Sequence, residues 1–126
     1  MYFQQDWMMR QIEMLAQFVA KTLFHKDMLL YDFLLEDAHV QGDGLPPQLR
    51  DLVAQGRLCE AENLLFDNIP PDRNRGYLEL ALNFYHSLNL LSDEELRAAQ
   101  FSREEIYEGM QDMLRKFDVA VPELAL

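Results

Sequence analysis

Cysteine, basic side chains and long apolar runs are all scarce in this sequence. One cysteine, Cys59, occurs among the 126 residues, so the chain cannot form an internal disulfide, and we expect its thiol to be buried in a helix. Eleven lysines and arginines stand against 22 aspartates and glutamates, for a net charge of −11. Nucleic acid and anionic membranes repel such an acidic surface. We therefore expect neither as a partner.

Signals for membrane insertion and secretion are missing as well. No uninterrupted apolar stretch approaches the roughly 20 residues needed to cross a bilayer. Near the start of the chain, Gln4, Gln5 and Asp6 interrupt the apolar residues, so the basic-then-apolar order of a signal peptide is not present. We therefore expect a cytoplasmic protein.

The familiar signatures of catalysis do not occur either. The sequence has no Gly-x-Ser-x-Gly and no glycine-rich loop of the kind that cradles phosphate. Cys59 has no histidine within reach along its own helix, so nothing indicates an activated thiol. We expect a protein that is not an enzyme and needs no cofactor.

One short motif leaves a metal-binding alternative open. Glu36 and His39 have the Glu-x-x-His spacing, which carboxylate-bridged di-iron bundles use twice. A second copy is missing, because the residue three positions before His86 is Asn83. We expect a solvated helix end at Glu36 and His39. The alternative is a bundle that binds a metal or small ligand, which would include an uncharacterised enzyme.

Apolar residues at helical spacing are abundant. They make up 49% of the chain, which fits a single globular domain over residues 1–126. The spacing predicts a long N-terminal helix at about residues 2–24, helical hairpins over about 27–117 and a tail at 118–126. Within the hairpin region it predicts helices at about 27–37, 77–90, 93–99 and 103–117, besides a pair of helices that meet at Gly56.

Two helix starts have nearly the same sequence. Ser92 is followed three positions later by Glu95, and Ser102 is followed three positions later by Glu105. A serine and a glutamate at this spacing form a capping box, in which each side chain bonds the backbone N–H near the other. These residues therefore predict helices that begin just after Ser92 and Ser102.

The helical pair around Gly56 resembles a tetratricopeptide repeat. A glycine that ends the first helix is followed by a small residue, Ala61, and then by an apolar residue, Leu65. A second partial match occurs downstream, at Tyr77, Leu80, Ala81 and Phe84. The expected fold is all-α, with antiparallel hairpins in a tetratricopeptide-like right-handed array of about six to seven helices.

A more specific resemblance begins at the N-terminal helix. The stretch DWMMRQIEMLAQFVAKTLF, residues 6–24, resembles the opening of a family of small bacterial proteins of unknown function, found mainly in Gram-positive bacteria. The resemblance covers most of the chain. It implies an all-helical, tetratricopeptide-like fold and a cytoplasmic location, and it implies no activity.

The repeat resemblance places a set of residues along a groove. On the helix at about 77–90 these groove positions are Leu78, Leu82, Tyr85 and His86, and their counterparts in the earlier hairpin are Arg50 and Val53. The competing interpretation is that the N-terminal helix simply covers Leu78 and Leu82. The methionine- and aromatic-rich face of that N-terminal helix is open to the same two interpretations, core or interface.

The function expected from these features is a non-enzymatic interaction or adaptor module. Its partner would be a protein, a peptide or a second copy of the same chain, because an incomplete repeat array leaves helix faces that need cover.

Overall fold

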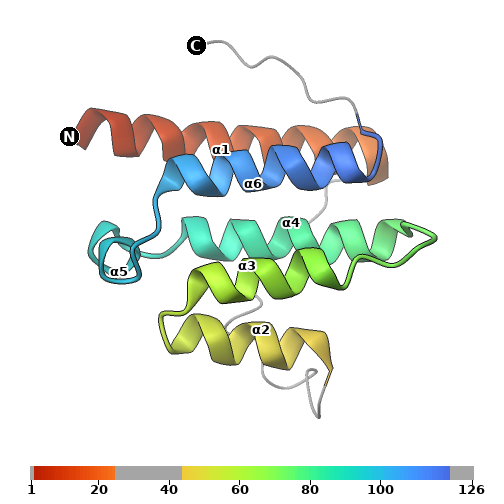
Figure 1. Ribbon diagram of the computed structural model, residues 1–126. Coiled ribbons are helices and arrows are strands. Elements are labelled where there is room, and N and C mark those ends of the chain that lie inside the picture. Colours follow the sequence, from red (N-terminus) through yellow and green to blue (C-terminus); the bar gives the residue numbers. More distant parts are fainter. Residues whose placement is uncertain (1, 25–43, 120–126) are drawn as a thin grey trace.

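The computed structural model describes residues 2–24 and 44–119, with side chains from Asp6 to Lys21 in the first of these segments. Both segments are helical, and neither contains a strand. The helices labelled in Figure 1 are α1 (Tyr2–Phe24), α2 (Leu45–Ala54), α3 (Leu58–Asp67), α4 (Arg75–Asn89), α5 (Asp93–Ala98) and α6 (Arg103–Lys116). The expected all-α fold class is therefore confirmed in the described part of the chain.

Helix α4 is the centre of the packing. Both α1 and α6 pack against it and against each other, while α2 packs on α3. In Figure 1 the α2–α3 pair lies on the side of α4 that faces away from α1. Each residue of α4 from Asn83 to Asn89 is buried, as expected for a helix with neighbours on several sides. The core is lined by Ile12, Leu15, Val19, Leu49, Leu58, Leu65, Leu78, Leu82, Phe84, Leu88, Leu96, Ile106, Met110 and Leu114.

The predicted turn between α2 and α3 is confirmed. Gly56 has a φ of 75°, in the left-handed region where a Cβ atom would be strained. The backbone N–H of Gly56 donates to the carbonyl of Val53 and that of Arg57 to the carbonyl of Leu52, both at 2.9 Å. These two bonds form a Schellman motif, which ends α2 and reverses the chain.

Both predicted capping boxes are present. The Ser92 hydroxyl accepts from the backbone N–H of Glu95 at 3.0 Å, and the Glu95 carboxylate accepts from the backbone N–H of Ser92 at 2.9 Å. Ser102 and Glu105 make the equivalent pair of bonds, both at 3.1 Å. The starts of α5 and α6 are thus set by local sequence.

The right-handed tetratricopeptide-like order is not confirmed. In such an array each hairpin stacks on the next one along the chain, whereas α1 packs against α4 and α6, which come much later in the sequence. The helix expected at 27–37 and the tail beyond Val119 lie outside the described residues. No helix in the described segments combines the length and the apolar character needed to cross a bilayer.

The expectation of a buried thiol is wrong. Cys59 is exposed, because the core-facing positions of α3 are Leu58, Ala61 and Leu65. A side chain one position after Leu58 points about 100° further around the helix and so faces outward.

A buried guanidinium joins the ends of three helices. Arg103, the first residue of α6, is 2% exposed. Its Nη1 donates to the backbone and side-chain oxygens of Asn89 at 2.8 and 2.9 Å, and its Nη2 donates to the carbonyl of Leu91 and the carboxylate of Asp93 at 2.9 Å each. Asn89 in turn donates from Nδ2 to the carbonyl of Met9 in α1 at 3.1 Å. Arg103 and Asn89 therefore fix α1, α4, α5 and α6 relative to one another.

Replacing Arg103 tests this junction. Arg103→Met keeps an aliphatic stem but leaves buried oxygens of Asn89 and Leu91 without a donor, so we expect a loss of about 2–4 kcal/mol in the free energy of unfolding in urea. Asp93→Asn is the control. Its side chain is half exposed, and an asparagine there keeps an oxygen that accepts from Arg103, so we expect a smaller loss of about 1 kcal/mol. Equal losses for the two variants would contradict the role given to Arg103.

Candidate functional site

The structure places most of the predicted groove residues in the interior. Leu78, Leu82 and Tyr85 are at most 1% exposed, and Val53 and His86 are 9% exposed. Arg50 is half-buried on α2. The predicted residues of α4 therefore do not line an open groove, because α1 and α6 both pack against this helix. The competing interpretation, in which the N-terminal helix covers α4, describes the structure better.

His86 is tied to α1 by a charged partner. Its Nδ1 lies 2.8 Å from Oε1 of Glu13. The close approach of the His86 imidazole holds the pKa of Glu13 below its usual value, although partial burial opposes this shift. The pair is therefore a polar contact that links α1 to α4.

The metal candidates of the sequence, Glu36 and His39, lie outside the described residues. Within residues 2–24 and 44–119, no group of three or more histidine, cysteine, aspartate or glutamate side chains is arranged to hold a metal ion.

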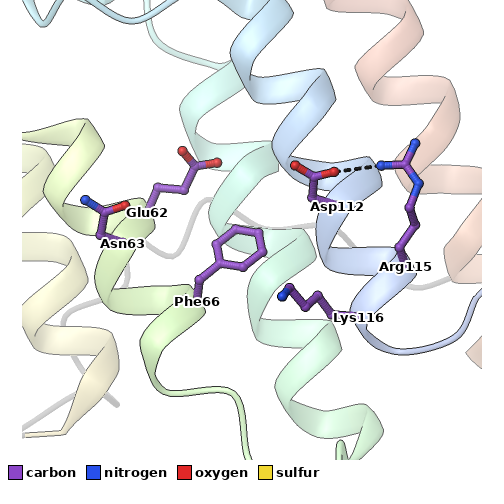
Figure 2. Close-up of a pocket in the computed structure, with 6 residues that line it drawn as sticks. All are labelled: Glu62, Asn63, Phe66, Asp112, Arg115 and Lys116. Carbon is purple, nitrogen blue, oxygen red and sulfur yellow. Dashed lines mark hydrogen bonds and ion pairs between the residues drawn. The ribbon is translucent and has the colours of Figure 1, made fainter.

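Two surface features stand out instead, and the first is a groove between α3 and α6. It has a volume of about 650 Å³, and Figure 2 shows the side chains that line it: Glu62, Asn63, Phe66, Asp112, Arg115 and Lys116. Three of these come from α3 and three from α6, each set on one helix face because residues three and four apart lie next to each other. We call this the α3–α6 groove.

A hydrogen bond from the core anchors one end of the groove. The hydroxyl of the buried Tyr85 donates to Oε2 of Glu62 at 2.6 Å, so α4 holds a side chain of α3 in place. Gly109 of α6 makes room for this bond. A Cβ atom at Gly109 would lie 2.2 Å from Oε2 of Glu62 and 2.6 Å from the hydroxyl of Tyr85, closer than side chains tolerate.

The groove holds an unusual carboxylate. Burial raises the pKa of Glu62, and the negative charges of Glu105 and Asp112 raise it further, while the hydrogen bond from Tyr85 opposes the shift. Burial also raises the pKa of the Tyr85 hydroxyl, so this group stays a neutral donor. Among the described residues no cation pairs with Glu62, since the Arg115 guanidinium bonds Asp112 at 2.6 Å.

The second feature is an apolar stripe on α1. Trp7, Met14 and Phe18 are 37%, 51% and 44% exposed and are spaced so that they share one helix face. We call them the α1 stripe. The stripe lies away from Ile12, Leu15 and Val19, which face the core. The N-terminal helix thus has both of the faces that the sequence left open, a core face and an exposed apolar face.

The groove was not predicted from the sequence. Its residues come from helices far apart in the chain, and no local motif marks Glu62, Phe66 or Asp112. One available signal was Gly109, a glycine in the middle of a helix with a clear apolar stripe. Such a glycine often marks a close approach by another element.

Comparison with known proteins gives a family but no activity. The model of a family of unknown function, DUF6483, matches residues 2–118, and the chain belongs to that family. No curated protein and no solved structure matches the chain.

The raised pKa of Glu62 predicts a pH effect on stability. The folded chain holds this pKa above the ordinary value of 4.5, so between 4.5 and the raised pKa the folded state binds more protons than the unfolded state. Stability due to Glu62 therefore falls as pH rises through this window. Glu62→Gln removes that fall, and we expect its advantage over the native chain in urea unfolding to grow across the window and level off above it.

The control is Glu60→Gln on the same helix. Arg57 lowers the pKa of Glu60, so the sign of any pH effect is reversed, and full exposure keeps it small. A Glu62→Gln difference that stays constant from about pH 4 to pH 8 would show that Glu62 is not perturbed by folding.

Proposed function

We propose that this member of the family is a non-enzymatic interaction module that pairs with a second copy of itself through the α1 stripe. The observation that carries the proposal is the exposure of Trp7, Met14 and Phe18 together on one face of a 23-residue helix. Three large apolar side chains in one row are typical of a surface that is covered in the functional state.

The charges beside the stripe favour a second copy as the occupant. Asp6, Arg10 and Lys21 are exposed along one flank of the stripe. Lys21 and Trp7 are equally far from Met14, one on either side of it. An antiparallel pair of α1 helices centred at Met14 therefore places Lys21 of one copy beside Trp7 and Asp6 of the other.

In an antiparallel pair, the charged side chains beside the α1 stripe make favourable contacts with the other copy. Lysine is attracted to the face of tryptophan as well as to aspartate, and the same geometry brings Arg10 beside Phe18 of the other copy. A parallel pair would instead place this charged flank beside the other flank of the partner's stripe, so Lys21 would not meet Asp6 or Trp7 of the other copy. Because one helix face is smaller than a standard interface of about 1,600 Å², we expect a dissociation constant on the order of micromolar.

Three finer proposals accompany this one. The resemblance at residues 6–24 supports an origin in Gram-positive bacteria and the cytoplasm as the site of action. The Schellman turn at Gly56 and the buried Ala61 support α2–α3 as a degenerate tetratricopeptide-like hairpin.

Static light scattering over a concentration series tests the pairing. We expect the native chain to approach twice its 14.8 kDa mass at high concentration, and Met14→Lys to stay monomeric because it places two like charges at the centre of the pair. Leu90→Lys is the matched control, since Leu90 is 48% exposed and lies at the C-cap of α4 rather than on α1.

Circular dichroism on the same samples confirms that each variant is folded. A native chain that remains monomeric at about a hundred times the expected dissociation constant would overturn the proposal. Equal loss of association in Met14→Lys and Leu90→Lys would overturn it as well.

A further inference from the structure

One end of the α3–α6 groove is acidic, and no cation among the described residues pairs with Glu62 there. Glu62 is half-buried there, and only its Oε2 has a hydrogen-bond donor among the described residues, the Tyr85 hydroxyl. Glu105 and Asp112 add negative charge close to it. A half-buried carboxylate among other acids is stabilised strongly by an incoming positive charge.

We propose that the groove binds an organic cation at the end of an aliphatic chain, as in an arginine or lysine side chain, with the head at Glu62 and the stem on Phe66. This inference concerns a different surface from the α1 stripe and does not depend on pairing of the protein.

The aromatic ring beside Glu62 suits such a ligand. Phe66 is half-buried and follows Glu62 by one turn of α3; Figure 2 shows its ring between α3 and α6, in the groove. An aliphatic stem packs well on an aromatic face, and a guanidinium or ammonium group near the ring gains a further attraction to it.

The neighbouring charges direct the cation to one end. Arg115 is paired with Asp112 at 2.6 Å, and Lys116 lies beyond Phe66 from Glu62 (Figure 2). A ligand cation is therefore attracted at the Glu62 end and repelled at the other. A divalent metal is a poorer fit, because it needs several oxygen ligands and Asp112 is already engaged.

The size of the groove favours a protein segment as the source of the cation. About 650 Å³ is within the range of sites for small molecules and exceeds what one side chain fills. A free amine and a basic residue in a partner protein present the same head and stem, so the experiment has to separate them.

Nuclear magnetic resonance titration of the full chain provides that experiment. The first probe is n-butylguanidinium, and n-butylurea is its neutral counterpart of nearly the same shape. The second probe is the tripeptide acetyl-Leu-Arg-Leu-amide, paired with the same peptide carrying citrulline. We expect both cations to shift the amide signals of Glu62, Phe66 and Gly109, and both neutral partners to bind at least about tenfold more weakly.

Comparing the two cationic probes shows whether the natural cation belongs to a partner protein or to a free amine. Peptide binding at least about tenfold tighter than butylguanidinium binding supports a protein segment, and equal affinities support a free amine. Affinity of either cation should fall as the pH is lowered toward protonation of Glu62, because a cation is attracted to the ionised form alone.

Variants separate a specific site from general attraction to an acidic protein. Glu62→Gln keeps an acceptor for Tyr85 and should weaken cation binding at least about tenfold, while Glu94→Gln removes one charge from α5 and should leave it unchanged. Phe66→Leu gives a second test if Glu62→Gln is poorly folded. Repeating the titration on Met14→Lys keeps the result independent of pairing. Equal binding of the neutral and cationic probes, or no effect of either groove variant, would overturn the inference.

Discussion

The fold depends on one buried positive charge whose hydrogen-bond partners lie on different elements. Arg103 donates to oxygens of Asn89, Leu91 and Asp93. The side chain of Asn89 in turn donates a hydrogen bond to the backbone of α1. Taking a guanidinium out of water is costly unless its donors are bonded, so a shift of any of these helix ends would break at least one of the bonds. That arrangement packs α1, α4 and α6 against one another, and both candidate surfaces follow from it.

Helix α4 supports the two surfaces in different ways. Because α1 uses its core face to cover α4, the neighbouring face with Trp7 is left at the surface. Gly109 of α6 has no side chain to block the space between Tyr85 and Glu62. The Tyr85 hydroxyl of α4 therefore reaches Glu62 and holds it at the groove. One surface is apolar and suited to another helix, and the other is acidic and suited to a cation. The proposed interaction module uses both surfaces.

Local features of the fold were predictable from the sequence, and the relations between helices were not. Gly56, Ser92 and Ser102 act on backbone groups within a few residues, so their motifs identify helix ends directly. Periodicity shows that Leu82 and Tyr85 are on an apolar stripe but does not say which helix covers that stripe. The groove brings Glu62 beside Asp112, a contact between distant segments that one sequence does not reveal. The exposed stripe was predictable in part. The sequence showed that α1 has more apolar surface than one neighbour covers, but not which apolar residues stay exposed.

Disulfide crosslinking tests the antiparallel α1 pair most directly, in chains that carry Cys59→Ser to remove the exposed native thiol. Met14 lies at the centre of the proposed pair, where two Cα atoms can approach within about 7 Å as a disulfide requires. The two Trp7 positions would lie about 21 Å apart along the helices at 1.5 Å per residue. The account predicts that Met14→Cys chains form covalent dimers under mild oxidation while Trp7→Cys chains do not. Dimers from Trp7→Cys, or none from Met14→Cys, would contradict it.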